Sequence, residues 1–304
     1  MKWGKCRFLL NPPRGTEVDY WIVFTEGRTL DYMTCHPQNT LFLAGEPPSK
    51  KIHSRSFYAQ FHQVVSSHEN DPHPRVTAAS PGLNWHVGLQ REQDCYSYGY
   101  DELVVMPFPQ KRNQISVVCS NLATTQGQRD RLNFLEQLKS ALGEQLVHFG
   151  RGFDPISDKM DAILPYRFHL VLENSCSANY WTEKISDAYL GWAFPFYAGC
   201  PNLDESFPSQ SFVRVLLNEP EAAISSIRLA LSSPQDRTEI ELISQSRDLA
   251  LNQFNLFARF SKWAELFHSP LPRQKVYINT HKAYRPFPKN MIFRIKSRFK
   301  GIQL

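Results

Sequence analysis

The sequence lacks the patterns that define several broad classes of protein. No apolar run approaches the roughly 18 residues of a membrane-spanning helix. The first residues hold only a three-residue apolar run before Asn11, which is too short for the core of a signal peptide. None of the six cysteines stands in C-x-x-C spacing, which argues against a zinc knuckle. These absences favour a cytoplasmic protein with free thiols.

Two further absences concern metals and nucleic acids. The chain contains no D-x-D motif, and His62, His68 and His73 match no zinc spacing, so we predict no metal site and interpret these histidines as loop or surface residues. The net charge is only +5. No nucleic-acid motif accompanies the basic residues, and we therefore expect no nucleic-acid partner.

The length and the hydrophobic content of the sequence are sufficient for two domains. It has 304 residues, of which 42% are hydrophobic, and domains usually span about 100–200 residues. In the second half, predicted strands alternate with predicted helices, which is typical of a parallel sheet covered on both faces, with the ligand at the carboxyl ends of its strands. The strands are predicted at 115–121, 145–150, 168–174, 194–199 and 211–217, and the helices at 129–142, 154–164, 180–190, 220–231 and 238–267.

The first half is less regular, and we place a linker at 111–114. The predicted organisation is a first domain at 1–112, a second domain at 113–270 and a basic tail at 271–304. Within the first domain we predict strands at 19–24, 39–45 and 102–109, a helix at 56–65, and a proline-rich loop at 68–82.

The densest polar cluster lies between a buried strand and the helix that follows it. Glu173 and Asn174 stand at the carboxyl end of the strand, while Thr182, Glu183 and Lys184 fall in the first turn of the helix. The free N–H groups of that turn favour a diphosphate, Lys184 would add a positive charge, and Glu183 suits two neighbouring sugar hydroxyls. The alternative is that Thr182 and Glu183 serve only to cap the helix.

A longer run around this cluster resembles a known family. Residues 166–215 are similar to the donor-binding region of the family 10 α-1,3-fucosyltransferases, which reads approximately Y-K-F-x-L-x-F-E-N-S, then Y-V-T-E-K, then D-A and a strand beginning S-F. Upstream, 117–138 resembles the family's V-V-S-N segment and places Arg131 on its arginine. The segment 41–49 resembles a strand ending T-G-E-N and places Glu46 on its glutamate, with Ala44 and Pro47 departing from the pattern.

The resemblance implies a GT-B fold, in which two Rossmann-like domains face each other across a cleft. Residues 1–112 would form the acceptor-side domain, and residues 113–270 would form the GDP-sugar-binding domain. It implies an inverting transferase that moves L-fucose from GDP-β-L-fucose to a glycan hydroxyl, with an α-1,3-type linkage. The acceptor would be a glycan or a lipid-linked glycan. No cofactor is required, and stimulation by a divalent cation is left open. Two alternatives remain: a different GDP-sugar, because Trp181 and Trp192 depart from the family pattern, or a degraded relative that only binds nucleotide or glycan.

The resemblance also assigns roles to individual side chains. Glu46 would be the catalytic base, unless it is an ordinary loop residue before two prolines. Arg131 and Lys184 would bind the diphosphate, and Glu183 would hold sugar hydroxyls. The full set of predicted donor-binding residues is Arg131, Glu173, Asn174, Tyr180, Glu183 and Lys184.

The basic tail suggests a location for the protein. Residues 284–304 mix cations with apolar side chains, and after Pro288 they could form a helix with apolar residues on one face. Such a helix would lie in the interface of an anionic membrane. We therefore predict a peripheral protein at the inner membrane face, with a solvated helix packed on the second domain as the alternative.

Overall fold

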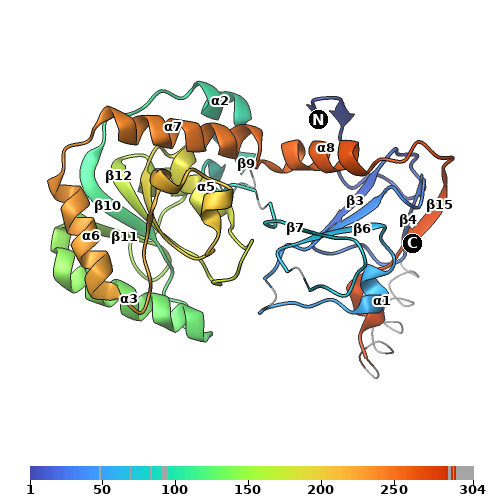
Figure 1. The fold of residues 1–304 in the computed structure, drawn as a ribbon, viewed down its shortest axis with the longest axis horizontal. Coiled ribbons are helices and arrows are strands. Elements are labelled where there is room, and N and C mark those ends of the chain that lie inside the picture. Colours follow the sequence, from blue (N-terminus) through green and yellow to red (C-terminus); the bar gives the residue numbers. More distant parts are fainter. Residues whose placement is uncertain are drawn as a thin grey trace. The chain divides into compact units, whose positions relative to one another are not determined.

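The chain forms two compact units, each built around a parallel sheet (Figure 1). The first unit contains residues 1–81 and 256–304, and the second contains residues 82–255. This computed structural model describes residues 1–286, except Pro48, Glu69, Leu83, Arg91, Glu92 and Asp94, together with Lys289 and Met291.

The sheet of the second unit has five parallel strands in the order β11-β10-β12-β13-β14. Every residue of β12 is buried, as expected of a central strand with helices on both of its faces. The strands are β10 (Arg112–Val118), β11 (Leu146–Phe149), β12 (Tyr166–Leu172), β13 (Phe194–Ala198) and β14 (Val213–Arg214).

The helices cover both faces of this sheet. On one face, Phe168 and Leu170 of β12 pack into a core cluster with side chains of α3 (Gln126–Leu142) and α6 (Pro220–Ser232), two helices that lie side by side in Figure 1. On the other face, Val171 packs against residues of α5. The helices of this second face are α4 (Lys159–Ile163), α5 (Glu183–Leu190) and α7 (Arg237–Asn252).

The strand order creates a switch point between β10 and β12. From β10 the chain crosses to β11 on one side, and it then returns to β12 on the opposite side of β10 before continuing to β13. In open parallel sheets the connections leave in opposite directions at such a point and open a crevice at the carboxyl ends of the two strands, where ligands bind. The topology therefore predicts that a ligand binds beside the loops that follow Val118 and Leu172.

The first unit holds a four-stranded parallel sheet in the order β3-β5-β6-β7. Its main core cluster surrounds Phe42 and Phe57. The unit also contains the short helix α1 (Arg55–Tyr58), α8 (Leu256–Phe267) and two antiparallel two-stranded sheets. One sheet pairs β1 (Lys2–Trp3) with β2 (Cys6–Arg7), and the other pairs β4 with β15. The strands are β3 (Trp21–Phe24), β4 (Asp31–Cys35), β5 (Thr40–Leu43), β6 (Gln63–Ser66), β7 (Val76–Ala78) and β15 (Gln274–Ile278).

The two parallel sheets confirm the predicted α/β class with two Rossmann-like domains. That the domains face each other across a cleft stays a prediction. The division of the chain differs from the predicted boundaries, because the second unit begins at residue 82 and the chain returns to the first unit at residue 256. The return is held by β15, whose five residues pair with β4 from Gln274↔Cys35 to Ile278↔Asp31.

Several predicted elements were wrong in type or extent. The loop predicted at 68–82 contains the strand β7, and the strand predicted at 211–217 is the two-residue β14. The helix at 56–65 is a single turn, α1, followed by β6, where Val64 and Val65 are buried in the sheet. The strand at 102–109 is instead the helix α2 (Tyr100–Val105), whose start is fixed by the Glu102 carboxylate, which accepts the Gly99 N–H at 2.8 Å.

The helix predicted to start at Asp154 starts later. Asp158 caps α4 by accepting the Met160 N–H at 2.8 Å. The long helix at 238–267 is divided into α7 and α8 by residues 253–255, where the chain passes from the second unit to the first.

The membrane prediction for the tail falls largely on residues 287–304, which lie outside the described residues apart from Lys289 and Met291. None of the helices among the described residues has the length and apolar character to span a bilayer.

Candidate functional site

A pocket of about 270 Å³ lies at the switch point of the second unit. Its floor comes from the ends of β10 and β12, including Val118 and Leu172, and its walls come from α3, α4 and α5. The charged and titratable side chains that line it are His86, Arg131, Lys159, His169, Glu183, Lys184 and Asp187, and Asn174 stands beside them.

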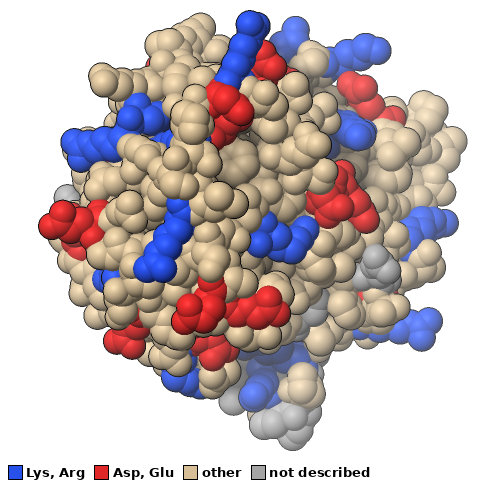
Figure 2. Space-filling model, turned by 60° about the vertical axis from the view of Figure 1, so that its left-hand side comes forward, with Lys and Arg blue, Asp and Glu red and all other residues tan. Residues whose placement is uncertain are grey.

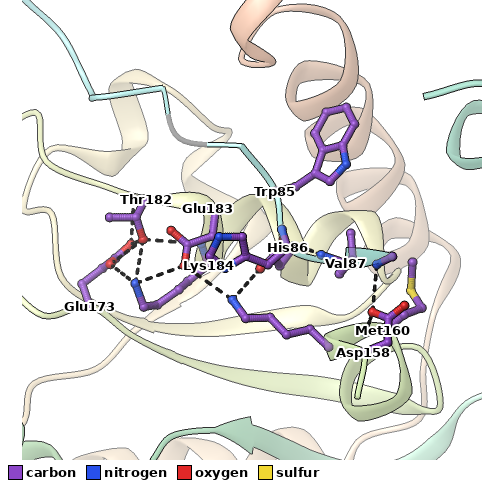
Figure 3. A network of polar contacts seen from close by, with 12 residues as sticks. Trp85, His86, Val87, Asp158, Met160, Glu173, Thr182, Glu183 and Lys184 are labelled. Atoms are coloured by element: carbon purple, nitrogen blue, oxygen red, sulfur yellow. Dashed lines mark hydrogen bonds and ion pairs between the residues drawn. The ribbon is translucent and has the colours of Figure 1, made fainter. Parts of the chain in front are cut away.

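A buried network fixes the first turn of α5 at the edge of this pocket (Figure 3). The Glu173 carboxylate accepts the Thr182 N–H at 2.8 Å and receives Lys184 Nζ at 3.1 Å. The Thr182 hydroxyl lies within 2.9 Å of both Glu173 oxygens and receives Lys184 Nζ at 2.8 Å. Gly199 permits this packing, because a Cβ there would lie 2.6 Å from Glu173 Cγ.

Opposite charges set the protonation states of the two residues that follow Thr182. Burial by itself would lower the pKa of the Lys184 ammonium, but the carboxylates of Glu173 and Glu183 outweigh it and hold that pKa above its ordinary value. Burial would raise the pKa of Glu183, but Lys184, Lys159 and His86 hold it well below its usual range. The pocket wall therefore carries a permanent ammonium beside a permanent carboxylate.

Arg131 has fewer polar partners among the described residues than the other two cations of the pocket, Lys159 and Lys184. The residue is only 8% exposed, its Nη1 makes one long contact of 3.5 Å to the Leu172 carbonyl, and its Nε has no hydrogen-bond partner among the described residues. A guanidinium is costly to bury without partners. Its position on α3, beside the switch point, suits a planar bidentate anion such as a phosphate.

A second set of contacts holds the segment 86–90 against the pocket (Figure 3). Asp187 Oδ1 accepts the backbone N–H groups of His86 at 2.7 Å and Val87 at 3.2 Å. Asp158 Oδ1 accepts the N–H of Gly88 at 2.8 Å, a residue whose φ of +79° and close approach to Tyr98 only glycine tolerates easily. His86 is thereby placed with Nδ1 3.4 Å from Glu183 Oε1.

The structure brings four of the six predicted donor-binding residues to the pocket. Arg131, Asn174, Glu183 and Lys184 line it. Glu173 does not, because its carboxylate is fully buried beneath Lys184 and occupied by Thr182 and Lys184. Glu173 therefore supports Thr182 and Lys184 in the first turn of α5.

The remaining predicted residues stand apart from the pocket lining. Tyr180 is 4% exposed and is not among the residues that line the pocket, although it interacts electrostatically with Lys184. Glu46 belongs to the first unit, where it follows β5 and pairs with Lys50 at 2.8 Å. Thr182 does cap α5 through Lys184 N–H, so the helix-capping interpretation holds for Thr182, whereas Glu183 also lines the pocket.

The pocket also contains residues that were not among the predicted donor-binding residues. Lys159 Nζ pairs with Asp187 at 2.7 Å and with Glu183 at 3.5 Å, and Asp187 falls on the D-A of the pattern that residues 166–215 resemble. His86 stands in an irregular segment, where its backbone N–H is held by the Asp187 carboxylate at 2.7 Å.

One group of side chains has the spacing of a metal site. Among the described residues, ligand atoms of His86, Glu183 and Asp187 lie within 4.8 Å of one another. The Lys159 ammonium already pairs with both of these carboxylates, and Lys184 Nζ lies 3.6 Å from Glu183. A divalent cation would have to displace or repel two ammonium groups, so this donor set suits lysine better than a metal.

Comparison with known proteins agrees with this arrangement of residues. Residues 108–228 match the family model described as "Glycosyltransferase family 10 (fucosyltransferase) C-term". The matched segment contains β10 to β14, Arg131 and the network around Glu173 and Lys184. This segment is therefore similar to family 10 glycosyltransferases.

Curated relatives are similar over parts of the chain. Alpha-(1,3)-fucosyltransferase FucT of Helicobacter pylori is 34% identical over 109 residues, which are 35% of this chain and 22% of that protein. Alpha-(1,3)-fucosyltransferase 7 of Bos taurus is 32% identical over 163 residues, which are 50% of this chain and 46% of that protein. The chain thus spans less than half the length of these relatives.

A crystal structure described as alpha1,3-fucosyltransferase with GDP-fucose aligns over 74% of this chain and 79% of that one, at 18% identity and a TM-score of 0.39.

The segment that matches the family model supplies most of the pocket. His86 lies upstream of the matched residues, and Glu46 lies in the first unit.

On the face drawn in Figure 2, basic and acidic side chains are interspersed over the described surface.

Proposed function

We propose that the protein transfers L-fucose from GDP-β-L-fucose to a glycan hydroxyl with inversion at the anomeric carbon. The observation that carries the proposal is the buried guanidinium of Arg131, which has no carboxylate partner among the described residues and lies at the switch point of the segment that matches the family 10 model. The names of the curated relatives support fucose as the sugar.

Donor binding would use the two sides of the pocket. Arg131 from α3 and Lys184 from α5 would hold the diphosphate between them, with the N-terminal N–H groups of α5 contributing their partial positive charge. Glu183, held ionised by its neighbours, would accept hydrogen bonds from sugar hydroxyls. Asn174 at the end of β12 is exposed and would complete the contact with its amide.

The chemical step is a single displacement. The acceptor oxygen forms a bond to the anomeric carbon of fucose, and the bond from that carbon to the diphosphate oxygen breaks, with the electron pair leaving on GDP. The acceptor proton passes to a carboxylate, for which Glu46 is the proposed base. Arg131 and Lys184 neutralise the charge that develops on the departing diphosphate.

No metal ion is required in this proposal, because the pocket carries three cationic side chains, Arg131, Lys159 and Lys184. They would provide the positive charge that a divalent ion otherwise supplies to a diphosphate. Transfer should therefore continue in the presence of a chelator. If a chelator abolishes transfer and added magnesium or manganese restores it, the proposal that no metal ion is required is rejected.

The acceptor is proposed to be a glycan, free or lipid-linked, reached by a protein that lies peripherally on the inner membrane face. This part rests on the sequence of the basic tail. Sedimentation with anionic vesicles tests it: pelleting should depend on residues 284–304 and fall as salt is raised.

A panel of nucleotide sugars tests the proposed donor. The protein is heated with GDP-fucose, GDP-mannose, GDP alone, UDP-galactose or no ligand, and only the guanosine ligands should raise the unfolding temperature. Release of GDP from GDP-fucose in the presence of glycan acceptors then tests transfer. Stronger stabilisation by another GDP-sugar would change the donor, and GDP-fucose binding without transfer to any acceptor would indicate a relative that only binds.

A further inference from the structure

His86 lines the pocket, although it was not among the predicted donor-binding residues. Its ring nitrogen Nδ1 lies 3.4 Å from Glu183 Oε1, and its side chain is 30% exposed, so that a ligand in the pocket can reach it. Its backbone N–H is held by the Asp187 carboxylate at 2.7 Å, a contact that does not depend on the ring.

The charges around His86 balance before any ligand binds. Three cationic side chains line the pocket, Arg131, Lys159 and Lys184, and they face the carboxylates of Glu183 and Asp187 together with Glu173 beneath Lys184. A nucleotide sugar adds two negative charges with its diphosphate. The occupied pocket therefore favours uptake of a positive charge.

Only a histidine can supply that charge by titration near neutral pH, and two histidines line the pocket. His169 cannot serve, because its burial lowers the pKa of its imidazole to about 3 and its Nδ1 is bound to the Ser116 hydroxyl at 2.8 Å. His86 is partly exposed and lies next to the Glu183 carboxylate, so that a bound diphosphate can reach its ring.

We propose that His86 contacts the donor and takes up a proton when the donor binds, so that its imidazolium adds a further positive charge to the diphosphate end of the pocket. The groups that face it are Glu183, Lys184 and Asp187 of α5, Asp158 and Lys159 at the start of α4, and His169 of β12. This inference rests on the proposed function, since it requires a nucleotide sugar in the pocket.

The pH dependence follows from the sign of the coupling. Because the protonated form of His86 binds the donor more tightly, donor affinity falls as pH rises through the pKa of His86. Coupling to one proton limits this fall to about tenfold per pH unit.

Calorimetric titration of the full chain with GDP-fucose tests the proposal. GDP-fucose is chosen because its diphosphate bears a substituent at both ends and does not itself titrate near neutral pH, unlike GDP. Binding is measured between about pH 6 and pH 8.5, where histidine titrates, in buffers of different ionisation enthalpy. The dependence of the measured enthalpy on the buffer gives the number of protons taken up.

Three variants separate a titrating charge from a structural role. His86→Gln should bind GDP-fucose without proton uptake, with an affinity close to that of the wild type at the high end of the pH range. His86→Arg keeps a positive charge at every pH tested, and it should bind tightly with no pH dependence. His268→Gln, at an exposed position in the first unit, is the control and should behave like the wild type.

The outcomes distinguish the two proposals. Proton uptake that persists in His86→Gln, or pH dependence that persists in His86→Arg, overturns the inference while leaving GDP-fucose binding established. Failure of the wild type to bind GDP-fucose overturns the proposed function and this inference with it. Circular dichroism of each variant checks the fold, which the backbone contacts to Asp187 and Asp158 should preserve.

Discussion

Replacing Arg131 with methionine should weaken GDP-fucose binding without destabilising the fold. The guanidinium is buried, has one long contact to the Leu172 carbonyl, and has no carboxylate partner among the described residues. Its charge is therefore poorly compensated in the free protein and becomes compensated only when an anion enters the pocket. Methionine fills a similar volume and carries no charge.

The expected magnitude follows from the contacts that are lost. A hydrogen bond to a charged group contributes roughly 1.5–3 kcal/mol, so the dissociation constant should rise between about tenfold and 150-fold. Removing an uncompensated buried charge should leave the free energy of unfolding of the free protein unchanged or slightly higher. Calorimetric titration gives the affinity, and urea unfolding without ligand gives the stability.

The matched control is Arg129→Met. Arg129 lies on the same helix but is exposed, and it bonds only to nearby groups such as the Ala123 carbonyl at 3.1 Å. This variant should bind GDP-fucose like the wild type. Wild-type affinity in a folded Arg131→Met protein would refute the reasoning, and so would a large loss of stability, because the guanidinium would then have a structural function.

Three further outcomes are expected. Lys184→Met should lower the free energy of unfolding by about 3–5 kcal/mol, because Glu173 is left as an unpaired buried carboxylate. Urea unfolding should show that the Glu173→Gln, Lys184→Met double variant recovers part of this loss. A Lys184→Met protein as stable as the wild type would contradict the network. Glu46→Gln should keep donor binding but lose about 10²–10⁴ in transfer rate, and normal turnover would place the base elsewhere. Burial lowers the pKa of His53 from 6.5 to about 4. The free energy of unfolding should therefore decrease by up to roughly 3 kcal/mol as pH falls from 6.5 to 4, because His53 takes up a proton at a higher pH in the unfolded chain than in the folded one. Acid unfolding monitored at several pH values should show a flatter dependence for His53→Phe, and an unchanged dependence would exclude His53 as the cause.

Most of the second unit could be predicted from the sequence. β12 appears as a continuous apolar run, and α3 as a helix with leucines on one face, because both patterns are local and repeat with the period of the element. The donor-binding residues from Glu173 to Lys184 are contiguous in the sequence, so a single strand end and the following helix turn bring them together.

Local pattern failed where tertiary contacts decided the conformation. Residues 63–66 could continue a helix by their spacing, but they lie between two parallel strands and are extended. Residues 100–105 read as a strand, yet Glu102 caps them as a helix and Leu103 is buried in the core of the second unit. A short apolar segment is compatible with a helix or a strand, and its tertiary contacts determine which of the two it forms.

By itself, the sequence determined the α/β class, the strand and helix that frame the pocket, and the residue types of the donor cluster. The reason is that hydrophobic period, helix caps and a contiguous motif all act over a few residues. Only the tertiary structure decided that β15 closes on β4, that Glu173 supports Lys184 rather than facing a ligand, and that His86 stands beside Glu183. Those contacts join segments that are far apart in the chain. They form because a buried polar group that has lost its contact with water is stable only when it has a hydrogen-bond partner in the protein.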